Sequence, residues 1–212
     1  MYRPCPPTPA ASMPQSFSLM LPRHARLPIP PSAITGEPVH SRDGLALRLR
    51  SIEPDDVQAL IRCFERLSPG DVRRRFHHAL SELPLPMAQR LCRIDPAGET
   101  ALVLMDHAVK PAEMRGVGRL YVDLASDSAE FSVLVESAWA RRGLGALLMR
   151  RLVQAARARG LAEIWGYVLM ENRPMLELCR ELGFQRRAMA GEPGTALIAL
   201  DLRTPGVQTA RH

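Results

Sequence analysis

The residues best suited to chemistry stand where a strand-like segment gives way to a helix. After Ala129 to Val135 and a short polar connection, the chain reads Arg141-Arg142-Gly143-Leu144-Gly145-Ala146, and a helical pattern begins. A glycine-rich turn at a helix N-terminus presents backbone N–H groups that lack a helical partner, at the positive end of the helix dipole. Such a turn suits a pyrophosphate, and its two arginines add positive charge. The pattern predicts an anion-binding cradle at residues 141–146.

The segment before this cradle alternates as a strand does. One face would carry Phe131, Val133 and Val135, and the other Glu130, Ser132 and Leu134. The helix after the cradle is predicted from Leu144 to about Arg159, with Gly160 closing it. Strand, turn and helix thus form one unit that fixes where the cradle lies.

The order of the remaining elements predicts a mixed α/β domain of about 160 residues. A strand at 45–50 is followed by three helices between Val57 and Ile94, and strands at 100–105 and 114–123 form an antiparallel meander with the strand before the cradle. Gly116 and Gly118 suggest a bulge or a close approach by another backbone. After the long helix come a strand at 162–168, a helix opened by Asn172, and a closing hairpin at 184–201.

The two ends of the chain differ from this domain. Residues 1–40 hold ten of the nineteen prolines, which remove backbone donors and block regular pairing. We therefore predict a Pro-rich flexible tail at 1–40, a folded domain at 41–203, and a second flexible tail at 204–212.

Composition narrows the classes of partner. The net charge of +6 comes almost wholly from arginine, since Lys110 is the only lysine. Two explanations are open: a surface that attracts anionic ligands, or an arginine-rich composition that only reflects a GC-rich genome. An aromatic content of 5% is low for a protein that stacks nucleic-acid bases, so no nucleic-acid partner is expected. No apolar run is long enough to span a membrane, and no secretory signal is evident.

Metal and disulfide chemistry are not indicated either. Cys5, Cys63, Cys92 and Cys179 are widely scattered, and the pair His77-His78 lacks a third ligand at zinc spacing. We predict no metal site and a reducing, cytoplasmic location.

Two stretches at the right separation resemble the GNAT superfamily of N-acetyltransferases. They are the strand, cradle and long helix, and the later segment ENRPMLELCRELGF at 171–184. The resemblance covers residues 45–201. It implies the GNAT fold of the α/β (α+β) class: a mixed central sheet of about six to seven strands with splayed middle strands, flanked by about four to five helices.

The N-terminal half narrows the resemblance. LRLRSIEPDDVQALIRCFERLSPGDVRRRFHHALSELP and the strands after it resemble the acetyltransferase domain of bacterial protein lysine acetyltransferases. That family implies acetyl-CoA as co-substrate and a protein acceptor, typically an acyl-CoA synthetase. There the domain is often fused to a regulatory domain, whereas here only the Pro-rich tail precedes it.

The resemblance also implies roles for individual residues. The backbone of Ser132, Val133, Leu134 and Val135 would pair with the pantetheine amides in a slot where this strand splays from 165–168. The acetyl-CoA pyrophosphate would lie on Arg141, Arg142, Gly143, Leu144, Gly145 and Ala146, and Asn172 would lie near the cofactor arm. Two positions depart from the pattern: Ala140 stands where Gln or Arg is usual, and Cys179 where many relatives carry a tyrosine acid.

Glu130 matches the general base of the family. A lysine amine, with an unperturbed pKa of about 10.4, is protonated at neutral pH and needs a base before it can attack a thioester. With both substrates held side by side, attack requires no covalent intermediate. Position alone favours a solvent-facing strand residue at Glu130, and it is the resemblance that favours the general base.

Two other functions fit the same residues: acetylation of a small amine, and non-catalytic acyl-CoA binding. A dinucleotide-binding oxidoreductase fits poorly, because the third glycine of that motif is replaced by Leu148.

Overall fold

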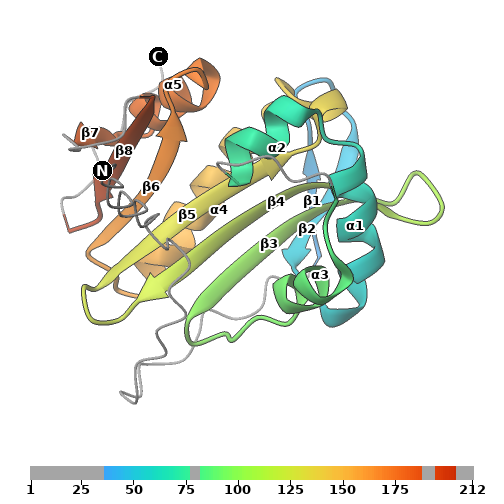
Figure 1. Ribbon diagram of the computed structural model, residues 1–212, viewed down its shortest axis with the longest axis horizontal. Helices are drawn as coiled ribbons and strands as arrows, with labels where there is room; N and C mark the ends of the chain where they lie inside the picture. Colours follow the sequence, from blue (N-terminus) through green and yellow to red (C-terminus); the bar gives the residue numbers. More distant parts are fainter. Residues whose placement is uncertain (1–35, 77–81, 188–193, 204–212) are drawn as a thin grey trace, which may run out of the picture.

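A computed structural model describes residues 36–76, 82–187 and 194–203, and these form one eight-stranded sheet in the order β1-β2-β3-β4-β5-β6-β8-β7 (Figure 1). The pairing of β5 with β6 is parallel and all other pairings are antiparallel. The strands are β1 (Glu37–His40), β2 (Ala46–Ser51), β3 (Glu99–Asp106), β4 (Glu113–Asp123), β5 (Ser128–Val135), β6 (Glu163–Leu169), β7 (Gln185–Arg187) and β8 (Thr195–Asp201).

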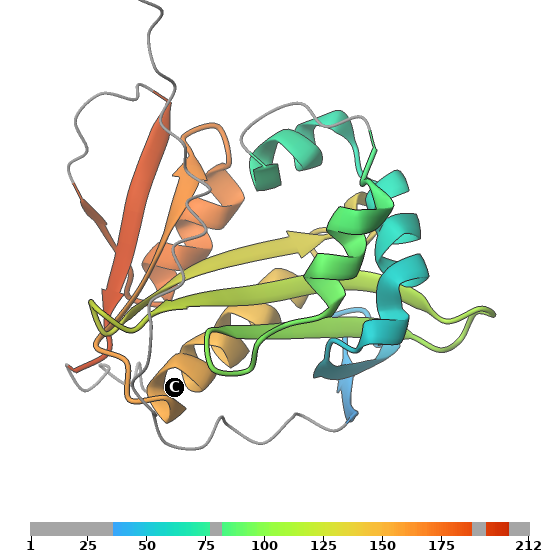
Figure 2. The ribbon, with the colours of Figure 1, turned by 60° about the horizontal axis from the view of Figure 1, so that its bottom comes forward.

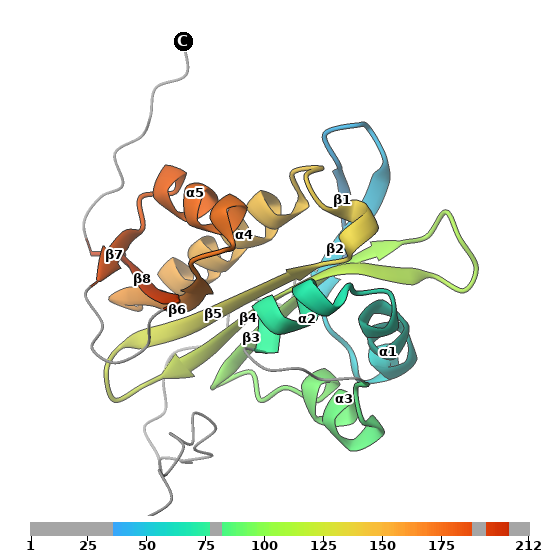
Figure 3. The ribbon, with the colours of Figure 1, turned by 45° about the horizontal axis from the view of Figure 1, so that its top comes forward.

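Within the described ranges, five α-helices cover this sheet, α1–α3 on one face and α4 and α5 on the other (Figure 3). They are α1 (Val57–Glu65), α2 (Pro69–Phe76), α3 (Leu85–Cys92), α4 (Leu144–Ala158) and α5 (Arg173–Glu181). Short 3-10 turns at Pro54–Asp56 and Ser137–Trp139 precede α1 and α4. Each face has its own apolar core: one gathers around Leu148 and Leu152 of α4, the other around Leu60 and Phe64 of α1.

Gly116 and Gly118 of β4 bring α4 close to the sheet. A Cβ on Gly116 would lie 3.3 Å from Leu148 Cδ1, and one on Gly118 would lie 3.3 Å from Leu152 Cδ1. The expected approach of another backbone is found at Gly116, where the Leu134 carbonyl would lie 3.2 Å from such a Cβ, and the register of β4 against β3 shifts beside it. At Gly118 the close neighbours are helix side chains. Tight packing here fixes α4, and with it the cradle at the start of the helix, against the sheet.

The α+β class and the helix number agree with the sequence, but the strand count is higher than the predicted six to seven. Strand β1 is the addition, and it lies inside the segment predicted as a tail, so a paired strand is present before Ser41. Its backbone groups are satisfied by antiparallel pairing of Glu37–His40 with β2, which proline-rich composition did not indicate. Residues 1–35 and 204–212 of the predicted tails lie outside the described residues, as does the pair His77-His78.

The parallel pair β5–β6 is short. Only three residue pairs join them, from Ser128 opposite Glu163 to Glu130 opposite Trp165, and the strands then diverge (Figure 2). The Phe131 ring lies against the backbone of Gly166, where even a Cβ would sit 2.8 Å from the ring. At the paired end the Trp165 indole donates a hydrogen bond to Ser128 Oγ at 3.2 Å. The splayed middle strands that the resemblance implied are thus present.

Candidate active site

Strand β5 turns alternate side chains to the two faces of the sheet, as its sequence predicted. Phe131, Val133 and Val135 pack in the core beneath α4, while Ser132 and Leu134 face α1 and α3. Glu130, two residues before Ser132 on the same face, is half-buried and belongs to the last pair before β5 and β6 separate. Glu130 therefore lies at the point where the strands open.

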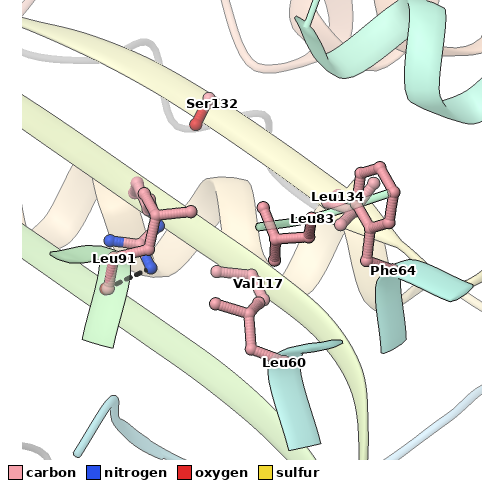
Figure 4. A pocket seen from close by; sticks show the side chains of 8 residues that line it. Leu60, Phe64, Leu83, Leu91, Val117, Ser132 and Leu134 are labelled. Carbon is pink, nitrogen blue, oxygen red and sulfur yellow. Dashed lines mark hydrogen bonds between the residues drawn. The ribbon is translucent and has the colours of Figure 1, made fainter. Parts of the chain in front are cut away.

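A hollow adjoins Ser132 on this face (Figure 4). Its apolar lining consists of Leu60, Phe64, Leu83, Leu91, Val117 and Leu134. The buried guanidinium of Arg119 also lines it and donates to the Leu91 carbonyl at 2.6 Å. Ser132 Oγ is buried and has no hydrogen-bond partner within the described part of the chain, so it is available to a substrate group or water.

The edge of β5 that faces β6 is unpaired beyond Glu130. The pairing ends there, so residues 131–135 form no ladder with β6. An extended ligand with amide groups could pair with this edge as an additional strand does. This edge includes Ser132 to Val135, for which the resemblance implied contact with pantetheine.

The cradle has an unusual backbone. Arg141 has φ +64° and Gly143 has φ +82°, both in the left-handed region. A non-glycine residue there carries backbone strain, which is frequent at functional sites. The first turn of α4 begins with Leu147 N–H donating to Gly143 C=O at 3.0 Å, so the N–H groups of residues 144–146 have no helical acceptor. No atom outside the neighbouring chain segment lies within 4 Å of a Cβ built on Gly145, so space is open beside that residue at the start of α4.

The predicted cradle side chains differ in their surroundings. Arg141 is exposed, Ala146 is half-buried, and Leu144 is buried in the core, where it anchors the start of α4. Arg142 forms an ion pair with Asp43 of the β1–β2 turn, and its guanidinium lies 5.2 Å from the centre of the Trp139 ring. Arg142 therefore also holds the cradle in place.

An ionic network under the cradle was not indicated by the sequence. Glu136, only 4% exposed, accepts a hydrogen bond from Arg115 at 3.0 Å and lies 3.1 Å from Arg66 Nε. Arg115 also donates to Asp106 at 2.9 Å, and it lies 5.0 Å from the Trp139 ring. Trp139 thus contacts Arg115 of the network and Arg142 of the cradle, which links the two. These partners lie far apart in the sequence, so no local pattern could reveal them.

Asn172 caps α5. Its side-chain oxygen accepts the Met175 N–H at 3.4 Å, and its backbone carbonyl accepts from Met175 and Leu176 at 3.1 Å. Capping alone explains why an asparagine stands at the helix start, and no ligand contact is needed to explain it. A contact between Asn172 and the cofactor stays a prediction.

Cys179 is a buried residue of α5 and is poorly suited to act as an acid. It is 1% exposed, and burial raises the pKa of its thiol to about 12. Proton transfer from such a thiol to a leaving thiolate, whose conjugate acid has a pKa of about 8.5, would be strongly uphill. We expect Cys179→Ala to keep kcat within about twofold and to leave the pH–rate profile from pH 6 to 9 unchanged, because the thiol stays protonated throughout. If the variant instead lost one limb of the pH–rate profile in steady-state measurements, Cys179 would be identified as the acid.

Metal centres and membrane spans are two further classes of site to consider. Across residues 36–76, 82–187 and 194–203, no group of three His, Cys, Asp or Glu side chains is arranged to hold a metal ion. None of the helices in these ranges is long and apolar enough to span a bilayer.

Comparisons with known proteins identify the family of this chain. The model of the acetyltransferase (GNAT) family matches residues 64–184. The chain is 28% identical over 142 residues to the acetyltransferase PA5475 of Pseudomonas aeruginosa, covering 67% of this chain and 76% of that protein.

Solved structures agree in fold. The GNAT domain of S. lividans PAT superimposes with a TM-score of 0.70 at 24% identity, covering 78% of this chain and 96% of that one. Spermidine N-acetyltransferase from Vibrio cholerae, solved with CoA and spermine, gives a TM-score of 0.61 at 17% identity, covering 74% of this chain and 96% of that one. A cAMP-binding acyltransferase from Mycobacterium smegmatis gives a TM-score of 0.55 at 23% identity, covering 82% of this chain and 49% of that one. The chain belongs to the GNAT family of acetyltransferases.

Proposed function

We propose that this protein transfers an acetyl group from acetyl-CoA to a lysine side chain of another protein, with Glu130 as general base. The observation that carries the proposal is the place of Glu130: its carboxylate lies in the last residue pair before β5 and β6 diverge. A thioester held between the diverging strands would lie next to that carboxylate. GNAT enzymes use acetyl-CoA, so this is the donor we assign.

The cofactor would extend from the strand edge to the helix start. The backbone of Ser132–Val135 would receive the pantetheine amides, and the free N–H groups at the start of α4 would receive the pyrophosphate. Both segments follow one another in the chain, since β5 leads into the cradle. This continuity supports a single extended acyl-CoA site.

Glu130 would remove the proton of the acceptor ammonium, directly or through one water, as the amine attacks the thioester carbonyl. A backbone N–H of the unpaired β5 edge would stabilise the developing oxyanion. The amine and thioester react within one ternary complex, so the acyl group passes to nitrogen without an enzyme-bound intermediate. The CoA thiolate would take its proton from water.

A protein acceptor is supported by the exposed surface next to this point. Helices α1–α3 lie over the β2–β5 side of the sheet, and no described helix covers the same face of β6 and β8 (Figure 3). Tyr167 of β6 is 41% exposed there, and Met170 just beyond the strand is 37% exposed. Exposed aromatic and methionine side chains are typical of protein contact surfaces. We therefore favour an acceptor large enough to rest on this surface, and an acyl-CoA synthetase is the acceptor class we propose.

The acceptor class can be tested with radiolabelled acetyl-CoA. We expect wild-type protein to label protein bands in a cell lysate and a purified acyl-CoA synthetase, and not to label spermidine, free lysine or aminoglycosides. Transfer only to small amines would replace the proposed acceptor while keeping the chemistry. Tight binding of acetyl-CoA without transfer to any acceptor would instead identify a non-catalytic acyl-CoA-binding module.

A further inference from the structure

The turn between β1 and β2 docks on the cradle. Arg42 donates its backbone N–H to the Arg142 carbonyl at 2.9 Å, and Asp43 forms an ion pair with the Arg142 side chain. The turn is itself well ordered by hydrogen bonds: Ser41 Oγ donates to Asp43 at 2.5 Å and accepts from Leu45 N–H at 3.0 Å. A segment about a hundred residues away in the sequence therefore forms one wall of the cradle.

The Arg42 side chain extends along Gly143. A Cβ at Gly143 would lie 3.0 Å from Arg42 Cγ and 3.2 Å from Arg42 Nε. The absence of a side chain at Gly143 is what leaves room for this arginine beside the start of α4. Arg42 is exposed, and no carboxylate among the described residues forms an ion pair with it.

The local charge balance favours an anion. Arg42, Arg141 and Arg142 surround the N-terminus of α4, and Asp43 is the carboxylate that pairs with Arg142. The Ser41 hydroxyl above all, and the Arg142 guanidinium as well, hold the pKa of Asp43 below its ordinary value, so Asp43 stays ionised and holds Arg142. With Arg142 paired to Asp43 and to Trp139, Arg42 and Arg141 remain for a ligand.

We propose that Arg42 is a phosphate-binding residue of the acyl-CoA site, supplying from the β1–β2 turn the polar contact that Ala140 cannot make. Guanidinium groups bind phosphate oxygens through paired, charge-assisted hydrogen bonds. CoA presents two such groups, the pyrophosphate and the 3′-phosphate, and Arg42 contacts one of them. The inference rests on the proposed function for the identity of the ligand.

The test is calorimetric binding of acetyl-CoA to wild type, Arg42→Ala, Arg42→Lys and the control Arg150→Ala. Arg150 is exposed on α4, two turns beyond Gly143, and its loss removes the same charge away from the cradle. We expect Arg42→Ala to raise the Kd about ten- to a hundredfold. Arg42→Lys should recover part of this loss because it keeps the charge, and Arg150→Ala should change the Kd less than about twofold.

A second probe, 3′-dephospho-acetyl-CoA, distinguishes the two phosphates. If Arg42 contacts the 3′-phosphate, Arg42→Ala weakens the binding of acetyl-CoA but not that of the dephospho form. If Arg42 contacts the pyrophosphate, the substitution weakens the binding of both probes equally. Binding of both probes to Arg42→Ala as tightly as to Arg150→Ala would overturn the proposal. Failure of wild type itself to bind acetyl-CoA would instead overturn the proposed function.

Discussion

Glu130→Gln is expected to lower kcat about 10²- to 10⁴-fold at pH 7 while acetyl-CoA binds with an unchanged Kd. Glutamine keeps the size of the side chain but cannot accept the proton of the acceptor ammonium. The residual rate then depends on the small fraction of amine that is already neutral. That fraction rises about tenfold per pH unit below the amine pKa of about 10.4, so the deficit should narrow from pH 7 to pH 9.

The comparison needs initial rates at saturating acetyl-CoA across this pH range, together with calorimetric binding. Glu177→Gln is a matched control, because Glu177 is exposed on α5 and the same chemical change there should leave both quantities unaltered. A Glu130→Gln deficit that stays constant with pH would argue for a structural role of Glu130 and against a general base.

Glu136→Ala is expected to destabilise the fold by about 3–5 kcal/mol. Glu136 is nearly fully buried, and its loss would leave Arg115 and Arg66 with an unbalanced positive charge beneath the cradle. At roughly 2–4 °C per kcal/mol for a domain of this size, the melting temperature should fall by about 10 °C. Because Trp139 connects Arg115 to Arg142, affinity for acetyl-CoA should fall as well.

Calorimetric unfolding would measure this effect, with Glu171→Ala as control. Glu171 is 52% exposed and lies 3.8 Å from Arg73, so its ion pair is solvated and worth about 0–1 kcal/mol. Similar melting temperatures for the two variants would show that the buried network does not stabilise the fold. The melting temperature of Glu136→Gln should lie between those of wild type and Glu136→Ala, because the amide oxygen can still accept a hydrogen bond from Arg115 while the charge is lost.

Much of the secondary structure could be predicted because it depends on neighbours in the chain. The helical spacing of Leu144, Leu148 and Leu152 and the alternation in β5 are local patterns, and each element lies where its pattern placed it. Strand β1 was missed because a four-residue edge strand in proline-rich sequence has almost no pattern of its own. Its stability comes from pairing with β2, which a local signal does not report.

The divergence of β5 and β6 shows a second limit to what could be predicted from the sequence. Its place was expected from family resemblance, and the packing that accompanies it emerged only in three dimensions. The Phe131 ring lies on Gly166 and meets the Phe184 ring edge-on at 5.4 Å, so aromatic bulk fills the space where a continued ladder would bring the strands together. Neither Phe131 nor Gly166 is unusual for a strand when each is considered alone.

The sequence by itself determined the turn and helix start at Arg141 to Ala146, because glycine conformation and a helix start are local properties of the chain. Only the tertiary structure decided what surrounds that segment. Arg42 and Asp43 approach from the β1–β2 turn, and Arg115 and Glu136 support it from beneath through Trp139. The physical reason is that ion pairs and ring contacts between distant residues exist only after the sheet and α4 have packed. Which arginines remain for an anion is therefore a property of the fold.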